Sequence, residues 1–158
     1  MRANRRPMVV DALLKTPELN VVVFSFPLNL VWEIWQMPFF RGMADQPYWM
    51  GVKACTLATL GDSGIALAAF WMTAVFARTR GWMLEPRKLD IAIFVGVGVI
   101  ATVLLETLAT NVLDRWAYGD NMPRLPVLGT GLLPFVQWMV IPLLVIWFVR
   151  LKIKKFPI

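Results

Sequence analysis

Histidine is absent from the 158 residues, and cysteine occurs only once, as Cys55. Without histidine the chain lacks the commonest metal ligand and the side chain that titrates nearest neutral pH. Bis-histidine haem ligation and histidine-based catalytic triads are therefore excluded. A single cysteine excludes an intrachain disulfide and any cysteine-rich metal site. The residue types thus indicate no metal site and identify no cofactor.

Charged residues are also scarce, at 16% of the chain, whereas hydrophobic residues reach 58%. Ordinary soluble domains have about 25% charged and about 45–50% apolar residues. This composition argues against a soluble enzyme, and disorder is excluded because it requires low hydrophobicity and high charge. The mean hydropathy of +0.62 agrees with an integral membrane protein.

Long apolar stretches predict the architecture, since a helix needs about 20 mostly apolar residues to cross the hydrocarbon core of a bilayer. Four stretches qualify, at residues 19–40, 54–77, 89–113 and 128–149. They predict an all-α polytopic membrane protein with four transmembrane helices in a single membrane domain. Residues 1–18 form a cytoplasmic or interfacial segment, with a short helix expected over 8–14 rather than a cleavable signal peptide. Residues 150–158 form a basic tail.

The basic residues are distributed unevenly around these spans, and the net charge is +6. The N-terminal segment, the second loop and the C-terminal tail each contain four Lys or Arg, whereas the first and third loops contain two each. Short cytoplasmic loops carry the excess of Lys and Arg, so both termini are predicted to be cytoplasmic. The expected partner of this charge is the lipid bilayer, and not nucleic acid.

The predicted spans contain three ionisable side chains, Glu33, Asp62 and Glu106, and no Lys or Arg. Counted from the outer span ends at about 1.5 Å per residue, all three lie roughly 10–12 Å below the outer surface. Gln137 in the fourth span falls near the same depth. We therefore predict a layer of carboxylates in the outer half of the bundle.

Such a layer needs compensation, because an acidic side chain at the bilayer centre costs about 2.5–3.5 kcal/mol on insertion scales. Protonation, a shared cation, water, or Arg115 and Arg124 drawn down from the third loop would supply it. A purely structural interpretation stays open, in which each acid fixes the register of its helix.

Polar and small residues at helical spacing accompany each acid, which predicts that the polar faces meet inside the bundle. The third loop adds turn residues and two prolines, so we expect a shaped lid over the bundle mouth. The candidate ligand-binding residues are Asn29, Trp32, Gln36, Arg115, Tyr118, Asp120, Arg124, Gln137 and Trp138.

Several short motifs together carry a resemblance. They are Asn29, Glu33, Gln36 and Pro38; Gly61-Asp62; Glu106; Arg115-Trp116-Ala117-Tyr118; Met122-Pro123; Leu128-Gly129-Thr130-Gly131-Leu132; and Gln137-Trp138. The chain resembles a group of small bacterial four-helix integral membrane proteins. The resemblance covers most of the chain and implies a multi-pass protein of the bacterial inner membrane, but it implies no activity.

Three functions remain open at this point. The first is an accessory or binding protein that packs with a larger membrane complex or holds a lipid-like or pigment-like ligand at the carboxylates. The second is an intramembrane acid/base enzyme acting on an isoprenoid or lipid, with Glu33 and Glu106 as the acid/base pair and Asp62 tuning them. The third is proton or cation transport through the same acids.

Overall fold

The computed structural model describes residues 16–43 and 45–155, and every long element in it is a helix. Four α-helices follow one another: α2 (Pro17–Gln36), α3 (Tyr48–Ala77), α4 (Lys88–Asn111) and α5 (Leu132–Lys155). A short 3-10 helix, η1 (Met37–Phe39), follows α2. The described residues contain no β-strand, only two isolated bridges. The helix expected over residues 8–14 lies outside the described part of the chain.

Three of these helices are long and apolar enough to cross a membrane: Tyr48–Ala77, Lys88–Asn111 and Leu132–Lys152. The all-α prediction is confirmed, and so are three of the four candidate spans. The remaining helix, α2, is not among them because polar side chains such as Asn20, Asn29 and Glu33 lower its mean hydropathy. Its role as a fourth span stays a prediction.

The helices begin and end at other residues than the predicted membrane spans. The α3 helix begins at Tyr48 rather than at residue 54, because Lys53 limits a membrane span without breaking a helix. The α5 helix begins at Leu132 rather than at residue 128, because the preceding residues form a turn in which Gly129 adopts a φ of +66°. Beyond residue 149 the same helix continues to Lys155 through the predicted basic tail.

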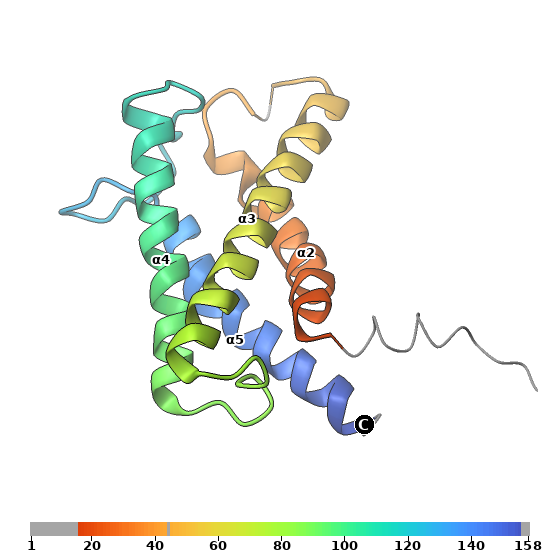
Figure 1. Ribbon diagram of the computed structural model, residues 1–158. Coiled ribbons are helices and arrows are strands. Elements are labelled where there is room, and N and C mark those ends of the chain that lie inside the picture. The colour runs from red at the N-terminus through yellow and green to blue at the C-terminus, as the bar shows by residue number, and fades with distance from the viewer. Residues whose placement is uncertain (1–15, 44, 156–158) are drawn as a thin grey trace, which may run out of the picture.

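The four helices form a closed ring in which α2 packs on α3, α3 on α4, α4 on α5, and α5 back on α2 (Figure 1). Helices that follow one another along the chain run antiparallel (Figure 1). The chain order therefore becomes the order around the bundle.

The bundle has two distinct ends. At one end, which we call the basic end, Arg80 of the α3–α4 loop pairs with Glu18 at 2.6 Å, and Lys152 donates to Asn20. We call the other end the hairpin end, because a bridge between Arg124 and Gly131 joins the two arms of the α4–α5 loop there. At this end the segment after α2 meets the same loop through a bridge between Phe40 and Tyr118. The start of α2, the α3–α4 loop and the end of α5 thus share one end.

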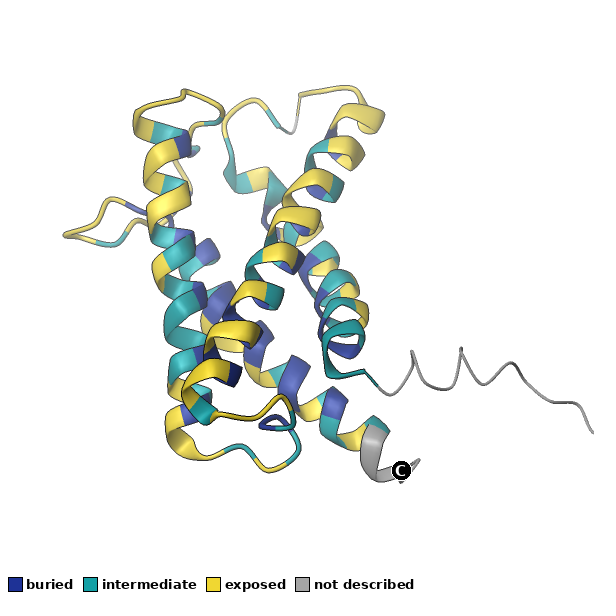
Figure 2. Cartoon of the chain, in the orientation of Figure 1, coloured by how far each residue is buried: buried dark blue, intermediate teal, exposed yellow. Residues whose placement is uncertain are grey.

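Toward the basic end the interior is apolar and aromatic. Phe70 of α3 and Phe94 of α4 are fully buried, and Trp82 of the intervening loop inserts between them. The ring centroids of Trp82 lie 5.8 Å from Phe70 and 5.3 Å from Phe94. The outward faces of α3 and α4 are largely exposed (Figure 2), and they carry large apolar residues such as Leu104, as a lipid-facing surface requires.

Candidate functional site

The side-chain amide of Gln137, on α5, is the centre of the polar interior. Its Nε2 donates to Asn29 Oδ1 at 2.9 Å, to Asp62 Oδ2 at 3.0 Å and, at 3.4 Å, to Glu33 Oε1. Only 2% of Gln137 is exposed. One buried donor group therefore joins α5 to acceptors on α2 and α3. We call Gln137, Asn29, Glu33, Asp62 and Gln36 the amide–carboxylate network.

Glu33 receives a second donor from its own helix. Gln36 Nε2 donates to Glu33 Oε1 at 2.7 Å, and Gln36 Oε1 in turn accepts from Trp32 Nε1 at 3.1 Å. Glu33 Oε1 and Asp62 Oδ2 accept from the same Gln137 Nε2, so the two carboxyl groups lie close together. Two acids and three amides thus share one connected set of hydrogen bonds.

Helical spacing explains how the sequence builds this network. Asn29, Glu33 and Gln36 recur at intervals of four and three residues, so they lie on one face of α2. That face turns inward, since Asn29 and Gln36 are almost fully buried. The predicted polar face of the first span is therefore confirmed as an interior face.

Glu106, on α4, has different partners. Its Oε2 accepts from the hydroxyl of Tyr118 and from Trp116 Nε1, the latter at 3.4 Å. Both donors belong to the α4–α5 loop, and Tyr118 is only 4% exposed. Within the described residues, no hydrogen bond joins Glu106 to Glu33 or Asp62.

Backbone hydrogen bonds on either side of Tyr118 hold this part of the α4–α5 loop in place. Gly119 N donates to Phe39 O at 2.8 Å, and Arg41 N donates to Ala117 O at 2.8 Å. A Cβ at Gly131 would stand 2.9 Å from Tyr118 Cε1, so the start of α5 also packs closely on the ring. The loop is therefore fastened to the segment after α2 on one side and to α5 on the other.

Burial, followed by the negative charge of Glu106, raises the pKa of Tyr118. The phenol therefore stays neutral over the whole physiological range and keeps its proton to donate to Glu106.

Three predicted loop residues do not reach the carboxylates. Arg41 and Asp120 form an exposed pair at 3.7 Å, and Arg124 lies over the Tyr118 ring with its guanidinium carbon 5.3 Å from the centroid. Arg115 is exposed. Within residues 16–43 and 45–155, no ion pair joins Arg115 or Arg124 to an acid. The predicted compensation by these arginines is thus not observed.

Trp138, one of the candidate ligand-binding residues, packs against α4. A Cβ at Gly98 would lie 2.0 Å from the Trp138 ring. Gly98 allows this close approach because it has no side chain.

Several buried polar atoms near the network have no partner within the described residues: Asn29 Nδ2, Thr59 Oγ1, Ser63 Oγ, Thr102 Oγ1 and Trp138 Nε1. Buried polar groups are normally hydrogen-bonded, and each unsatisfied one costs about 1–3 kcal/mol. These atoms could therefore form hydrogen bonds with water or with a polar ligand. Ser63 was not selected from the sequence, although its position beside Asp62 was an available signal.

The described residues hold no group of three or more His, Cys, Asp or Glu side chains close enough together for a metal ion. The predicted carboxylate layer is therefore divided into a Glu33–Asp62 pair and a separate, loop-bound Glu106. This division arises because Trp116 and Tyr118 of the α4–α5 loop bind Glu106, and the depth of a residue in the membrane does not reveal such partners.

Comparisons with models of protein families, with curated proteins and with solved structures found no match for this chain. The fold itself defines the class: an all-helical protein with three helices that are long and apolar enough to cross a membrane.

Proposed function

We propose that the chain is a small multi-pass protein of the bacterial inner membrane that holds the polar head of a lipid-like or pigment-like ligand in its amide–carboxylate network. In this arrangement α2 is the fourth span and the basic end lies in the cytoplasm. The observation that supports it best is the buried Gln137 amide shared by Asn29, Glu33 and Asp62.

The chemistry of the network favours a ligand that donates hydrogen bonds or carries a positive charge. Glu33 and Asp62 present carboxylate oxygens, and no described ion pair supplies a cation to either acid. An ammonium or hydroxyl head group would provide the missing donors. The unpaired hydroxyls of Thr59 and Ser63 on α3 offer further contacts beside Asp62.

Ligand extraction tests this proposal. The full chain is purified in mild detergent, and bound small molecules are identified by mass spectrometry. We expect a co-purifying amphipathic molecule that is lost when Glu33→Gln and Asp62→Asn are combined. Glu85→Gln, which neutralises an exposed loop carboxylate, is the matched control and should retain it. An isolated wild-type monomer without any bound lipid or partner protein would contradict the proposal.

The proposed orientation is tested by thiol labelling after Cys55 has been replaced by Ala. Asp45 and Glu85 are exposed acidic residues in the α2–α3 and α3–α4 loops, and each can carry a single cysteine. A membrane-impermeant reagent added to intact cells should label Asp45→Cys and leave Glu85→Cys unlabelled. The reverse pattern would place the basic end outside.

An acid/base enzyme is a second candidate, favoured by the placement of Glu33 and Asp62 at the same Gln137 donor. One protonated carboxyl can donate a proton to an apolar substrate while its ionised neighbour removes another, which amounts to an isomerisation without any co-reactant. Glu106 would then tune the pair from its loop site. Conversion of the extracted ligand to an isomer by wild type, abolished in Glu33→Gln although the ligand still binds, would assign the enzyme.

Transport receives less support from the interior. Phe70, Trp82 and Phe94 fill the bundle between the network and the basic end, and their rings are buried. An ion path needs polar groups or water along its whole length. A saturable ion flux in proteoliposomes would nevertheless overturn this view.

A further inference from the structure

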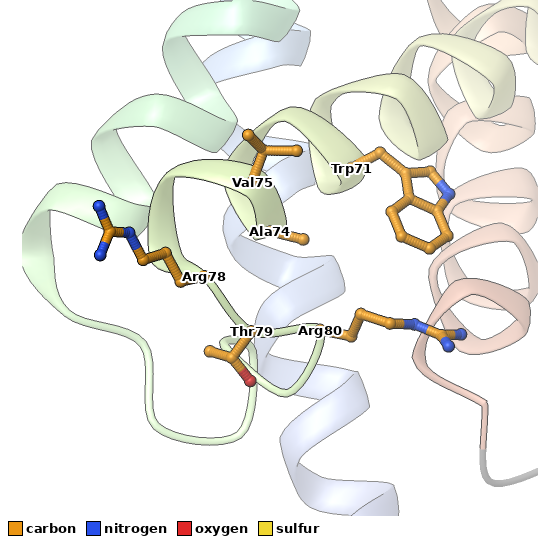
Figure 3. A pocket seen from close by; sticks show the side chains of 6 residues that line it. All are labelled: Trp71, Ala74, Val75, Arg78, Thr79 and Arg80. Atoms are coloured by element: carbon orange, nitrogen blue, oxygen red, sulfur yellow. The ribbon is translucent and has the colours of Figure 1, made fainter.

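A shallow hollow of about 270 Å³ lies at the basic end, where α3 passes into the α3–α4 loop (Figure 3). The last turns of α3 contribute its apolar wall, and the loop contributes its polar rim. Its lining residues are Trp71, Ala74, Val75, Arg78, Thr79 and Arg80.

The rim is positively charged. The side chains of Arg78 and Arg80 extend to opposite sides of the hollow, with Thr79 between them (Figure 3). Arg80 is paired with Glu18 at 2.6 Å and lies over the Trp71 ring at 5.2 Å. The ion pairs within the described residues do not include Arg78. Because the charges of Arg80 and Glu18 cancel each other, the charge of Arg78 is the one that can attract a ligand.

The backbone presents Arg78 at a fixed place. Arg78 ends α3 in the left-handed region, with a φ of 55°, and its N–H is bonded to the carbonyls of Ala74 and Val75. Thr79 Oγ1 accepts from Gly81 N at 3.1 Å, which leaves the hydroxyl proton of Thr79 to donate outward. One guanidinium and one hydroxyl are the kind of donors that recognise a phosphate.

The apolar wall continues directly from this rim. Trp71, Val75 and Phe76 are exposed on the last turns of α3, and Val75 is 73% exposed. A tryptophan at this level is typical of the membrane–water interface. A molecule that fits both parts has an anionic phosphate head at Arg78 and acyl chains along α3.

We propose that this hollow binds the head group of an anionic phospholipid of the cytoplasmic leaflet. Basic pockets on the cytoplasmic side of membrane helices recognise such heads, and each Lys or Arg near the surface contributes about 1 kcal/mol of attraction. The proposal rests on the proposed orientation for its biological setting, but not on the amide–carboxylate network.

Native mass spectrometry of the full chain in detergent tests the site without depending on orientation. Phosphatidylglycerol and phosphatidylcholine with identical acyl chains are titrated separately. We expect wild type to bind phosphatidylglycerol more tightly and Arg78→Gln to weaken that binding about fivefold, with phosphatidylcholine unaffected. Arg78→Lys, which keeps the charge, should retain most of the preference.

Arg41→Gln is the matched control, since Arg41 is an exposed arginine at the opposite end. Equal weakening in Arg41→Gln would show a general charge effect and overturn the site, and so would equal affinity of wild type for the two lipids. Inorganic phosphate is added as a competitor. If it displaces phosphatidylglycerol at comparable concentration, the hollow is a phosphate site and the lipid assignment is wrong.

Discussion

The two halves of the bundle are held together by different kinds of interaction. Near the basic end, Phe70, Trp82 and Phe94 fill the interior by contact between apolar rings. Near the hairpin end, Gln137 connects three helices by directional hydrogen bonds. Close packing has no directional preference, whereas hydrogen bonds require particular donors and acceptors to meet. We infer that packing stabilises one half of the bundle and that hydrogen bonds fix which side chains meet in the other.

The largest expected effect is in the aromatic half. Phe94→Ala removes a fully buried ring and should lower the free energy of unfolding by about 3–5 kcal/mol. Titration with a denaturing detergent, followed by circular dichroism, measures this change. Leu104→Ala on the same helix is the control, because Leu104 is 63% exposed and its loss should have little effect. Similar losses for both would mean that the rings do not form a core.

At the junction of the halves, Gly98→Ala should cost about 1–3 kcal/mol, because the added methyl group meets the Trp138 ring. Gly96→Ala provides a matched control two residues away, where a Cβ would contact nothing within 4 Å. That variant should gain about 0.5–1 kcal/mol from helix propensity. The same detergent titration distinguishes them, and equal behaviour would contradict the close α4–α5 contact.

In the polar half, Gln137→Leu should lower stability by about 1–3 kcal/mol, because it leaves Asn29 and Asp62 without their donor. Gln137→Glu should be worse, since it replaces the donor by another acid beside two carboxylates. Detergent titration of both variants gives the order. A Leu variant more stable than wild type would show that the network is not stabilising and would strengthen a purely functional role.

Tyr118→Phe removes the hydroxyl that donates a hydrogen bond to Glu106. The free energy that holds the α4–α5 loop in place should fall by about 1 kcal/mol. Hydrogen exchange of loop amides measures the change. The raised pKa of the folded Tyr118 also gives a pH dependence. The contribution is fully present below about pH 10, the ordinary tyrosine value, and falls above it because the released side chain ionises first. Wild-type protection should therefore decline at alkaline pH more than that of Tyr118→Phe.

The smallest effect is expected at the surface of the basic end. Arg80→Gln breaks the pair with Glu18, but the arginine is 60% exposed, so the loss should be about 0–1 kcal/mol. Arg41→Gln, with an even more exposed pair, should change nothing measurable. A larger loss in Arg80→Gln would mean that this pair fastens the α3–α4 loop to α2.

The interior polar face of α2 and the positions of three apolar helices were predictable, since both depend on local periodicity and hydropathy. The partner of Glu106 was not predictable from its depth, because Tyr118 reaches it only after the α4–α5 loop pairs with the segment following α2. Likewise, the start of α5 depends on a turn at Gly129 that an apolar count includes in the helix.

The sequence by itself determined the class of protein, because residue composition reflects the solvent in which a chain is stable. It also predicted an inward polar face on each of the three helices that carry an acid, since the helical period places those side chains together. Only the tertiary structure decided which of those side chains touch. It joined Glu33 and Asp62 through Gln137 and paired Glu106 with Tyr118. These contacts depend on the order of the helices around the bundle, on the paths of the loops and on close approaches such as that at Gly98.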